Sequence, residues 1–169
     1  MIVIAHTSLQ SIENHLLSLG GGNHPDNMER LARFDGHYLV SLAENEFLDL
    51  VFLQNDDVAK IAPRGCSRAL SAVAERGIAL GQPRLASNWD LADNLRRMRE
   101  KLTSRSVFHE PLVICEARNG EEQCGPWYIQ DGSHRALAYT TLMLLKETPY
   151  EPQTAYCSMS KRMYHSFLG

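Results

Sequence analysis

The chain has 169 residues, of which 44% are hydrophobic and 22% are charged. This length and composition predict one domain with its own hydrophobic core. The formal net charge is −3 at pH 7, so we expect no general attraction of the chain to nucleic acid. The four cysteines form no Cys-x-x-Cys pair and no zinc-ligand spacing, which argues against a secreted disulfide scaffold and a structural metal site. No stretch approaches the ~20 apolar residues of a membrane span and the N-terminus lacks the basic region of a signal peptide, so we expect a cytoplasmic protein with no membrane partner.

Apolar spacing in the first half of the chain predicts short strands and helices. In chain order, the predicted elements are a buried strand at 2–5, a helix at 8–19, a helical turn at 28–34, two strands at 38–42 and 47–53, and a helix at 67–80. We expect Ser8 or Ser11 to cap the first helix and Gly20-Gly21-Gly22 to end it. The two neighbouring strands are predicted to form a hairpin, with a helix over 44–53 as the alternative.

The second half of the chain has a sharper pattern. One apolar stripe predicts a helix, and it consists of Leu91, Leu95, Met98 and Leu102. Asp90 or Asn88 can cap this helix. The basic side chains on its other faces are interpreted as a solvated surface, and they are Arg96, Arg97, Arg99 and Lys101. The remaining predicted elements are strands at 111–116 and 127–130, a turn at 131–132, a helix at 133–145, a strand at 153–157 and a short helix at 161–167.

The turn at residues 131–135 lies between a predicted strand and a predicted helix. Because the first N–H groups of a helix have no intrahelical partners and the helix dipole is positive there, this position suits an anion. Gly132 permits a positive φ or close approach of a ligand, and Ser133 can cap the helix or donate its hydroxyl. His134 and Arg135 add two donors beside the same N–H groups. The spacing alone also fits an ordinary turn in which those two side chains face solvent.

The run Trp127-Tyr-Ile-Gln-Asp-Gly-Ser-His-Arg-Ala-Leu-Ala-Tyr139 resembles the signature of the ParB/sulfiredoxin superfamily, in which a strand ends in an Asp-Gly-x-His-Arg turn and enters a helix. The upstream order is similar to that of ParB domains: a Pro83-Arg84 segment, a helix that opens at Asn88–Leu91 and the strand at 111–116. The resemblance covers about residues 82–157.

This resemblance implies an α/β (α+β) fold. A mixed sheet would carry a phosphate-binding helix N-terminus. Residues 81–169 would form the ParB/sulfiredoxin-like core, and residues 1–80 would form an N-terminal elaboration of the same domain.

The resemblance also implies an activity. Sulfiredoxin carries a cysteine in its turn, where this chain has Ser133, so we exclude the sulfiredoxin reaction. The turn is closest to the Asp-Gly-His-His-Arg turn of the ADP-dependent serine kinases. We therefore expect a nucleotide-binding protein that is a phosphotransferase, acting on a small hydroxyl-bearing metabolite such as an amino acid.

By the same resemblance, individual residues receive roles. The expected ligand is ATP or ADP, with CTP as a further option. Its phosphates are expected to bind Gly132, Ser133, His134, Arg135 and Arg84. Asp131 and His134 are the expected catalytic residues, with Asp131 near the transferred group or a Mg²⁺ ion. The kinases use a glutamate base before the core helix, but residues 84–90 contain no glutamate. The acids that could replace this base are Asp90, Glu110 and Glu116. For each of them, a surface or capping role is the simpler interpretation.

Two alternatives remain open at this point. One is a ParB-like nucleic-acid-binding or nuclease protein, which is less favoured because only about a dozen residues follow Cys157, too few for the usual helix-turn-helix region. The other is a non-catalytic nucleotide-sensing module. The oligomeric state and the role of residues 1–80 do not follow from the sequence.

Overall fold

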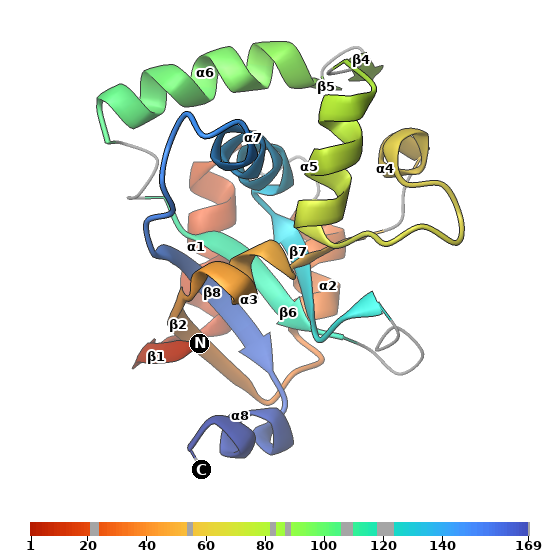
Figure 1. The fold of residues 1–169 in the computed structure, drawn as a ribbon. Coiled ribbons are helices and arrows are strands. Elements are labelled where there is room, and N and C mark those ends of the chain that lie inside the picture. Colours follow the sequence, from red (N-terminus) through yellow and green to blue (C-terminus); the bar gives the residue numbers. More distant parts are fainter. Residues whose placement is uncertain are drawn as a thin grey trace.

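The computed structural model describes residues 1–20, 24–53, 56–81, 84–86, 89–105, 110–117 and 124–168. At its centre is a six-stranded sheet with the strand order β1-β2-β8-β6-β7-β3 (Figure 1). The strands of this sheet are β1 (Ile2–His6), β2 (Gly36–Leu42), β3 (Val51–Phe52), β6 (Leu112–Glu116), β7 (Trp127–Asp131) and β8 (Gln153–Met159). The pairs β6–β8 and β3–β7 are parallel and the other pairs are antiparallel, so the predicted mixed sheet and α/β class are confirmed.

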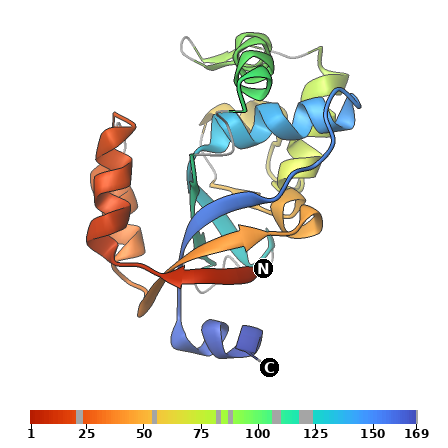
Figure 2. The ribbon, with the colours of Figure 1, turned by 90° about the vertical axis from the view of Figure 1, so that its left-hand side faces the viewer.

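Helices cover both faces of the sheet. The described helices are α1 (Leu9–Ser18), α2 (His24–Leu31), α3 (Glu44–Leu48), α4 (Asp56–Ile61), α5 (Leu70–Ala79), α6 (Leu91–Thr103), α7 (Ser133–Leu144) and α8 (Lys161–Leu168). Figure 2 shows α1 and α2 on one face and α5, α6 and α7 together on the other. A separate two-stranded ribbon of β4 (Arg84–Ala86) and β5 (Trp89–Asp90) lies at the start of α6.

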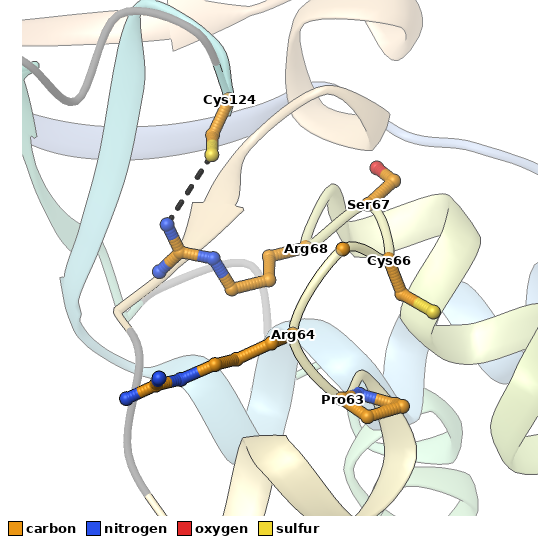
Figure 3. Close-up of a pocket in the computed structure, with 7 residues that line it drawn as sticks. Pro63, Arg64, Cys66, Ser67, Arg68 and Cys124 are labelled. Carbon is orange, nitrogen blue, oxygen red and sulfur yellow. Dashed lines mark hydrogen bonds between the residues drawn. The ribbon is translucent and has the colours of Figure 1, made fainter.

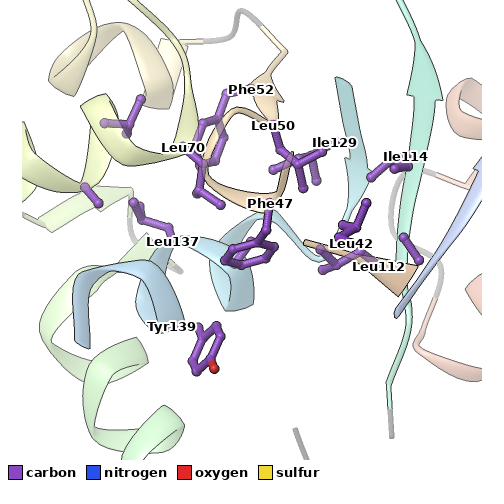
Figure 4. Close-up of a cluster of buried hydrophobic side chains, with 14 of the residues drawn as sticks. Leu42, Phe47, Leu50, Phe52, Leu70, Leu112, Ile114, Ile129, Leu137 and Tyr139 are labelled. Atoms are coloured by element: carbon purple, nitrogen blue, oxygen red, sulfur yellow. The ribbon is translucent and has the colours of Figure 1, made fainter. Parts of the chain in front are cut away.

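The larger hydrophobic core lies under α7. Residues 136–142 of this helix are all buried, because the helix is enclosed by the sheet and by its neighbours α5 and α6. On the sheet side, Tyr139 meets Phe47 of α3 edge-on, with 5.8 Å between ring centroids. Leu137 packs in the same cluster with side chains of β6 and β7 (Figure 4). This packing holds the N-terminus of α7 against the end of β7.

Most elements of strong periodicity form as predicted. The predicted cap of the first helix is confirmed, since Ser8 Oγ accepts from the backbone N–H of Ser11 at 3.1 Å. Asp90 caps α6 by accepting from the N–H of Asp93 at 3.1 Å, whereas the alternative cap Asn88 lies outside the described residues. The strands predicted at 111–116, 127–130 and 153–157 are also present, as β6, β7 and β8.

The predicted hairpin of 38–42 with 47–53 is wrong. After β2 the chain forms the short helix α3, in which Phe47 is buried and the Glu46 side chain accepts from the N–H of Ala43. The helical alternative therefore holds for the first part of 44–53. The remaining apolar residues form β3, which pairs with β7 at the far edge of the sheet.

The prediction of a buried strand at 2–5 is also wrong in one respect. The strand forms, but β1 lies at the edge of the sheet, and Ile2 and Ile4 are 71% and 52% exposed. The helical turn predicted at 28–34 is present as α2, four residues earlier than predicted.

None of the described helices is both long and apolar enough to cross a membrane.

Candidate functional site

The predicted phosphate turn lies at the junction of β7 and α7. Asp131 ends the strand and Gly132 follows with a φ of +85°, which confirms the expected positive φ at this glycine. A Cβ added to Gly132 would lie 2.5 Å from Leu112 Cδ2, and Leu112 is a buried core residue. Glycine is therefore required here both by the backbone conformation and by the packing against β6.

The cap of α7 differs from the prediction. Gly132 itself is the N-cap residue, and no side chain makes a capping hydrogen bond. The prediction that Ser133 caps the helix is therefore wrong, because the left-handed turn at Gly132 makes Ser133 the first helical residue. The first-turn N–H groups of a helix without a side-chain cap take their partners from water or from a ligand. This leaves the N-terminus of α7 suited to an anion.

Arg135 is held inside the structure. Its Nη1 donates to Glu110 Oε2 at 2.6 Å and its Nη2 donates to the carbonyl of Pro111 at 3.1 Å. The Arg135 side chain is only 14% exposed, so the alternative in which it faces solvent is wrong. His134, the neighbouring donor, is exposed.

Glu110 joins α6 to α7. Lys101 of α6 donates to both carboxylate oxygens of Glu110, at 3.0 and 2.8 Å, while Arg135 approaches from α7. Partial burial alone raises the pKa of Glu110, but the hydrogen bonds from Lys101 and Arg135 outweigh burial and lower the pKa below its ordinary value. The carboxylate is therefore charged at neutral pH, and it stands beside the two cations that a phosphate would contact.

A cavity of about 200 Å³ lies between α6 and α7, next to this cluster. Its lining residues are Asn94, Arg97, Met98, Lys101, His134, Arg135 and Ala138. The described residues of this lining include several basic side chains and no carboxylate. The Asn94 amide nitrogen is shielded from solvent and finds no hydrogen-bond partner among the described residues, so it is a donor that an acceptor in the cavity would satisfy. The cations of the lining are paired, Arg97 with Asp93 and both Lys101 and Arg135 with Glu110, so an anion that enters the cavity exchanges with these carboxylates.

No family model, curated protein or solved structure matches the chain. The fold class that the structure shows is a mixed α/β domain, and the assignment of the site depends on the residues around the turn.

Three arginines of α6 are paired with acids, and one of them, Arg97, also lines the cavity. Arg96 bonds both Asp93 and Glu100, Arg97 pairs with Asp93 at 2.8 Å, and Arg99 makes two hydrogen bonds to Glu147. These arginines are exposed, which agrees with their interpretation as a solvated surface. Each of these positive charges therefore has a nearby carboxylate.

Only one of the three acids considered as a base lies beside the turn. Asp90 is used as the cap of α6, and Glu116 accepts from Ser160 N at 2.7 Å. Glu116 pairs with Trp127 in the sheet register, at the opposite end of β7 from Asp131. Glu110 is the acid that reaches the site, through its contacts with Lys101 and Arg135.

Arg84 and Mg²⁺ were also expected at the site. The backbone of Arg84 lies in β4 and pairs with Asp90, so it stands near the start of α6, but its side chain lies outside the described part of the chain. The described residues contain no group of three His, Cys, Asp or Glu side chains that could hold a metal ion. Asp131, at the turn itself, offers one carboxylate, and Mg²⁺ commonly uses one or two carboxylates together with substrate phosphates.

The contribution of α6 to the site is not predicted from the sequence. Asn94, Lys101 and the intervening Arg97 and Met98 share one face of this helix, at spacings of three, four and seven residues. That spacing was visible in the sequence. The partner helix and the position of Glu110 were not, because they depend on contacts between distant segments.

Proposed function

We propose that this protein binds the phosphates of ATP or ADP at the start of α7 and transfers a phosphoryl group to a small hydroxyl-bearing metabolite such as an amino acid. The observation that carries this proposal is the basic cavity between α6 and α7 beside a helix N-terminus that no side chain caps. The resemblance of residues 127–139 to the ParB/sulfiredoxin signature, and to its serine-kinase branch, supports the choice of a nucleotide.

The cavity sets which part of a nucleotide it receives. At about 200 Å³ it is smaller than typical small-molecule sites of roughly 300–1,000 Å³. We infer that phosphate groups enter it, while the base and sugar lie outside. Gly132 and Ser133 contribute backbone N–H groups, and Lys101, His134 and Arg135 contribute side-chain donors. Asn94 supplies one further donor from α6.

A phosphate that binds in the cavity replaces the carboxylate of Glu110 as the partner of the basic side chains. In the structure Glu110 already neutralises Lys101 and Arg135, so an incoming phosphate competes with this carboxylate for both cations. We infer that Glu110 releases Arg135 when the nucleotide binds. The freed carboxylate then lies beside the phosphates, where it can orient the hydroxyl of the acceptor.

In the proposed reaction, the acceptor oxygen bonds to the terminal phosphorus as the bond to the leaving phosphate oxygen breaks. Such transfers depend mainly on positioning and on neutralising charge. Asp131 would hold Mg²⁺, which supplies charge neutralisation when bound. His134, exposed at the rim of the cavity, is the proposed group to take the hydroxyl proton.

The first test is thermal stability with ATP, ADP, CTP or inorganic phosphate, each with and without Mg²⁺. A ligand at about 100 times its Kd adds roughly 2.7 kcal/mol, which raises the Tm of a chain of this size by about 5–10 °C. We expect Arg135→Gln to abolish most of the rise. Arg99→Gln, which removes an arginine of α6 outside the cavity, should retain it. No rise with any ligand, or an unchanged rise in Arg135→Gln, would refute the site.

The second test is turnover. Incubation with the stabilising nucleotide and a panel of amino acids and other hydroxyl compounds should yield a phosphorylated acceptor, detected by ³¹P NMR. Tight nucleotide binding without any product across the panel would instead support a nucleotide-sensing module. Retention on DNA at ~0.15 M salt, without a nucleotide effect, would support the ParB-like nucleic-acid alternative.

A further inference from the structure

A second cavity, of about 410 Å³, lies between the loop before α5 and Cys124 (Figure 3). We call it the arginine pocket, and its lining residues are Pro63, Arg64, Gly65, Cys66, Ser67, Arg68 and Cys124. The loop before α5 forms most of it, and Cys124, just before β7, closes one side. None of these residues lines the cavity between α6 and α7.

Arg68 is fixed in position by its surroundings. Its Nη1 donates to the carbonyl of Phe52 at 2.9 Å and its Nη2 donates to Cys124 Sγ at 3.3 Å. The guanidinium also lies over the Tyr128 ring, 5.8 Å from its centroid. These contacts use only part of the donor capacity of a guanidinium, which has five N–H groups. Arg68 is thus a preorganised cation at the edge of the pocket.

Arg64 adds a second positive charge to the same pocket. It is exposed, and it makes no hydrogen bond or ion pair with any described residue. Figure 3 shows its side chain extended in the same direction as that of Arg68. Among the described residues no acid belongs to the lining, whereas Arg96, Arg97 and Arg99 of α6 all have carboxylate partners. The arginine pocket therefore keeps positive charge that is neutralised elsewhere on the molecule.

Ser67, just before α5, adds a hydroxyl group to the pocket. The helix begins directly after Arg68, and its N-cap Ala69 makes no side-chain capping bond. Ser67 Oγ accepts from the N–H of Ala69 at 3.2 Å, which leaves the hydroxyl hydrogen of Ser67 to donate. One hydroxyl donor thus lies in the pocket with the two arginines, while the N–H of Leu70, the first residue of α5, donates to the carbonyl of Leu50 at 2.7 Å.

We propose that the arginine pocket binds a small phosphate dianion, the phosphate group of a phosphorylated metabolite, between Arg64 and Arg68. A phosphate monoester carries a charge of about −1.5 to −2 at neutral pH, which matches two guanidinium groups. Guanidinium groups also bind phosphate oxygens through paired hydrogen bonds. The volume of the pocket is within the range of small-molecule sites, about 300–1,000 Å³. This site is independent of the function proposed for the α7 turn.

Phosphate binding in the arginine pocket can be measured through the reactivity of its cysteines. Cys66 and Cys124 line the pocket and are exposed, whereas Cys115 and Cys157 are fully buried. Iodoacetamide should therefore alkylate the folded protein at the two pocket cysteines, as followed by peptide mass spectrometry. We expect inorganic phosphate, titrated at constant ionic strength, to slow both reactions. At ten times its Kd it should reduce the rates about tenfold, because about a tenth of the sites remain empty.

Substitutions test whether the arginines of the pocket cause the protection by phosphate. In Arg64→Gln, we expect protection to require about tenfold more phosphate, since a charge-assisted contact is lost. Arg162→Gln, which removes an exposed arginine of α8, should behave as the wild type. Arg135→Gln should also leave the protection unchanged, which separates this pocket from the α7 site. Because Arg64 is exposed and unpaired among the described residues, its substitution should leave the Tm unchanged.

Three outcomes would overturn the proposal. The first is alkylation that phosphate does not slow. The second is an identical phosphate titration in Arg64→Gln and in the wild type. The third is equal protection by succinate at the same concentration, which would show a general site for dianions rather than a phosphate site.

Discussion

Glu110 is the side chain that connects the two helices of the candidate site. It binds Lys101 of α6 and Arg135 of α7, so it occupies the contacts that the proposed phosphate requires. We predict that Glu110→Gln binds inorganic phosphate about fivefold more tightly than the wild type. The estimate corresponds to about 1 kcal/mol, as expected for partly exposed ion pairs. Isothermal titration calorimetry would measure it.

The matched control for this variant is Glu147→Gln. It removes the acid that binds Arg99 on the outside of α6 and should leave phosphate affinity unchanged. Weaker binding in Glu110→Gln would show that the carboxylate supports the phosphate site rather than competing for it.

The lowered pKa of Glu110 also predicts a pH dependence. The unfolded carboxyl titrates near its ordinary pKa of 4.5, and the folded one titrates lower. The ion pairs therefore add stability above pH 4.5, and this contribution is lost as the pH falls through the folded pKa. Urea denaturation should show the wild type more stable than Glu110→Gln by up to about 1 kcal/mol at neutral pH. The two should converge as the pH falls below the folded pKa of Glu110, and a difference that does not shrink as the pH falls from neutral would contradict this account.

Gly132 is the second residue on which the turn depends. We predict that Gly132→Ala lowers the free energy of unfolding by about 2–4 kcal/mol, from backbone strain and from the clash with Leu112. The control is Gly20→Ala, where φ is +93° but nothing lies within 4 Å of the added Cβ. That variant should cost about 1 kcal/mol, the backbone strain alone. Equal losses in denaturant unfolding would show that the packing against Leu112 is not important.

At the scale of elements, the end of α7 contains an unusual residue. Lys146 has a φ of +61°, and its N–H bonds the carbonyl of Met143, while the N–H of Glu147 bonds the carbonyl of Leu142, both at 2.9 Å. This is the Schellman arrangement, in which glycine is the favoured residue at the left-handed position. We predict that Lys146→Gly raises the free energy of unfolding by about 0.5–1 kcal/mol. Lys146→Asn should give a smaller gain, and a loss in both variants would show that the lysine side chain itself stabilises the helix end.

Some elements of the fold could be predicted from the sequence and others could not. The caps Ser8 and Asp90 and the apolar stripe of α6 are local signals, and they predicted the elements correctly. The hairpin prediction failed because the partner of β3 is β7, far along the chain, and no local pattern identifies a distant strand. The candidate site divides in the same way. The glycine turn was predictable from residues 131–135, whereas the contacts of Glu110 and the arginine pocket arise from tertiary packing.

At the scale of the whole molecule, the two parts of the chain share one sheet. β2, from the first 80 residues, pairs along its whole length with β8, from Gly36 with Met159 to Leu42 with Gln153. Phe47 of α3 packs against Tyr139 of α7 in the same core. We therefore predict that a fragment of residues 81–169 does not fold alone. Its far-ultraviolet circular dichroism and amide NMR dispersion should resemble those of an unfolded chain.

A further experiment would separate lost contacts from other defects of that fragment. Co-expression of residues 1–80 with residues 81–169 should restore a stable complex, because the missing strands and helices are then supplied in trans. A folded, monomeric fragment 81–169 on its own would contradict the shared core and would support an independent C-terminal domain.

The position of β8 has a consequence for the order in which the sheet can form. In chain order it is the last of the six strands, yet it lies between β2 and β6 in the interior. During translation β2 and β6 are both made before β8, and until then each has an unpaired edge where β8 belongs. Open strand edges of this kind template pairing with other chains. Until its final strand joins the two parts of the sheet, the nascent chain therefore presents two edges that are open to pairing with other chains.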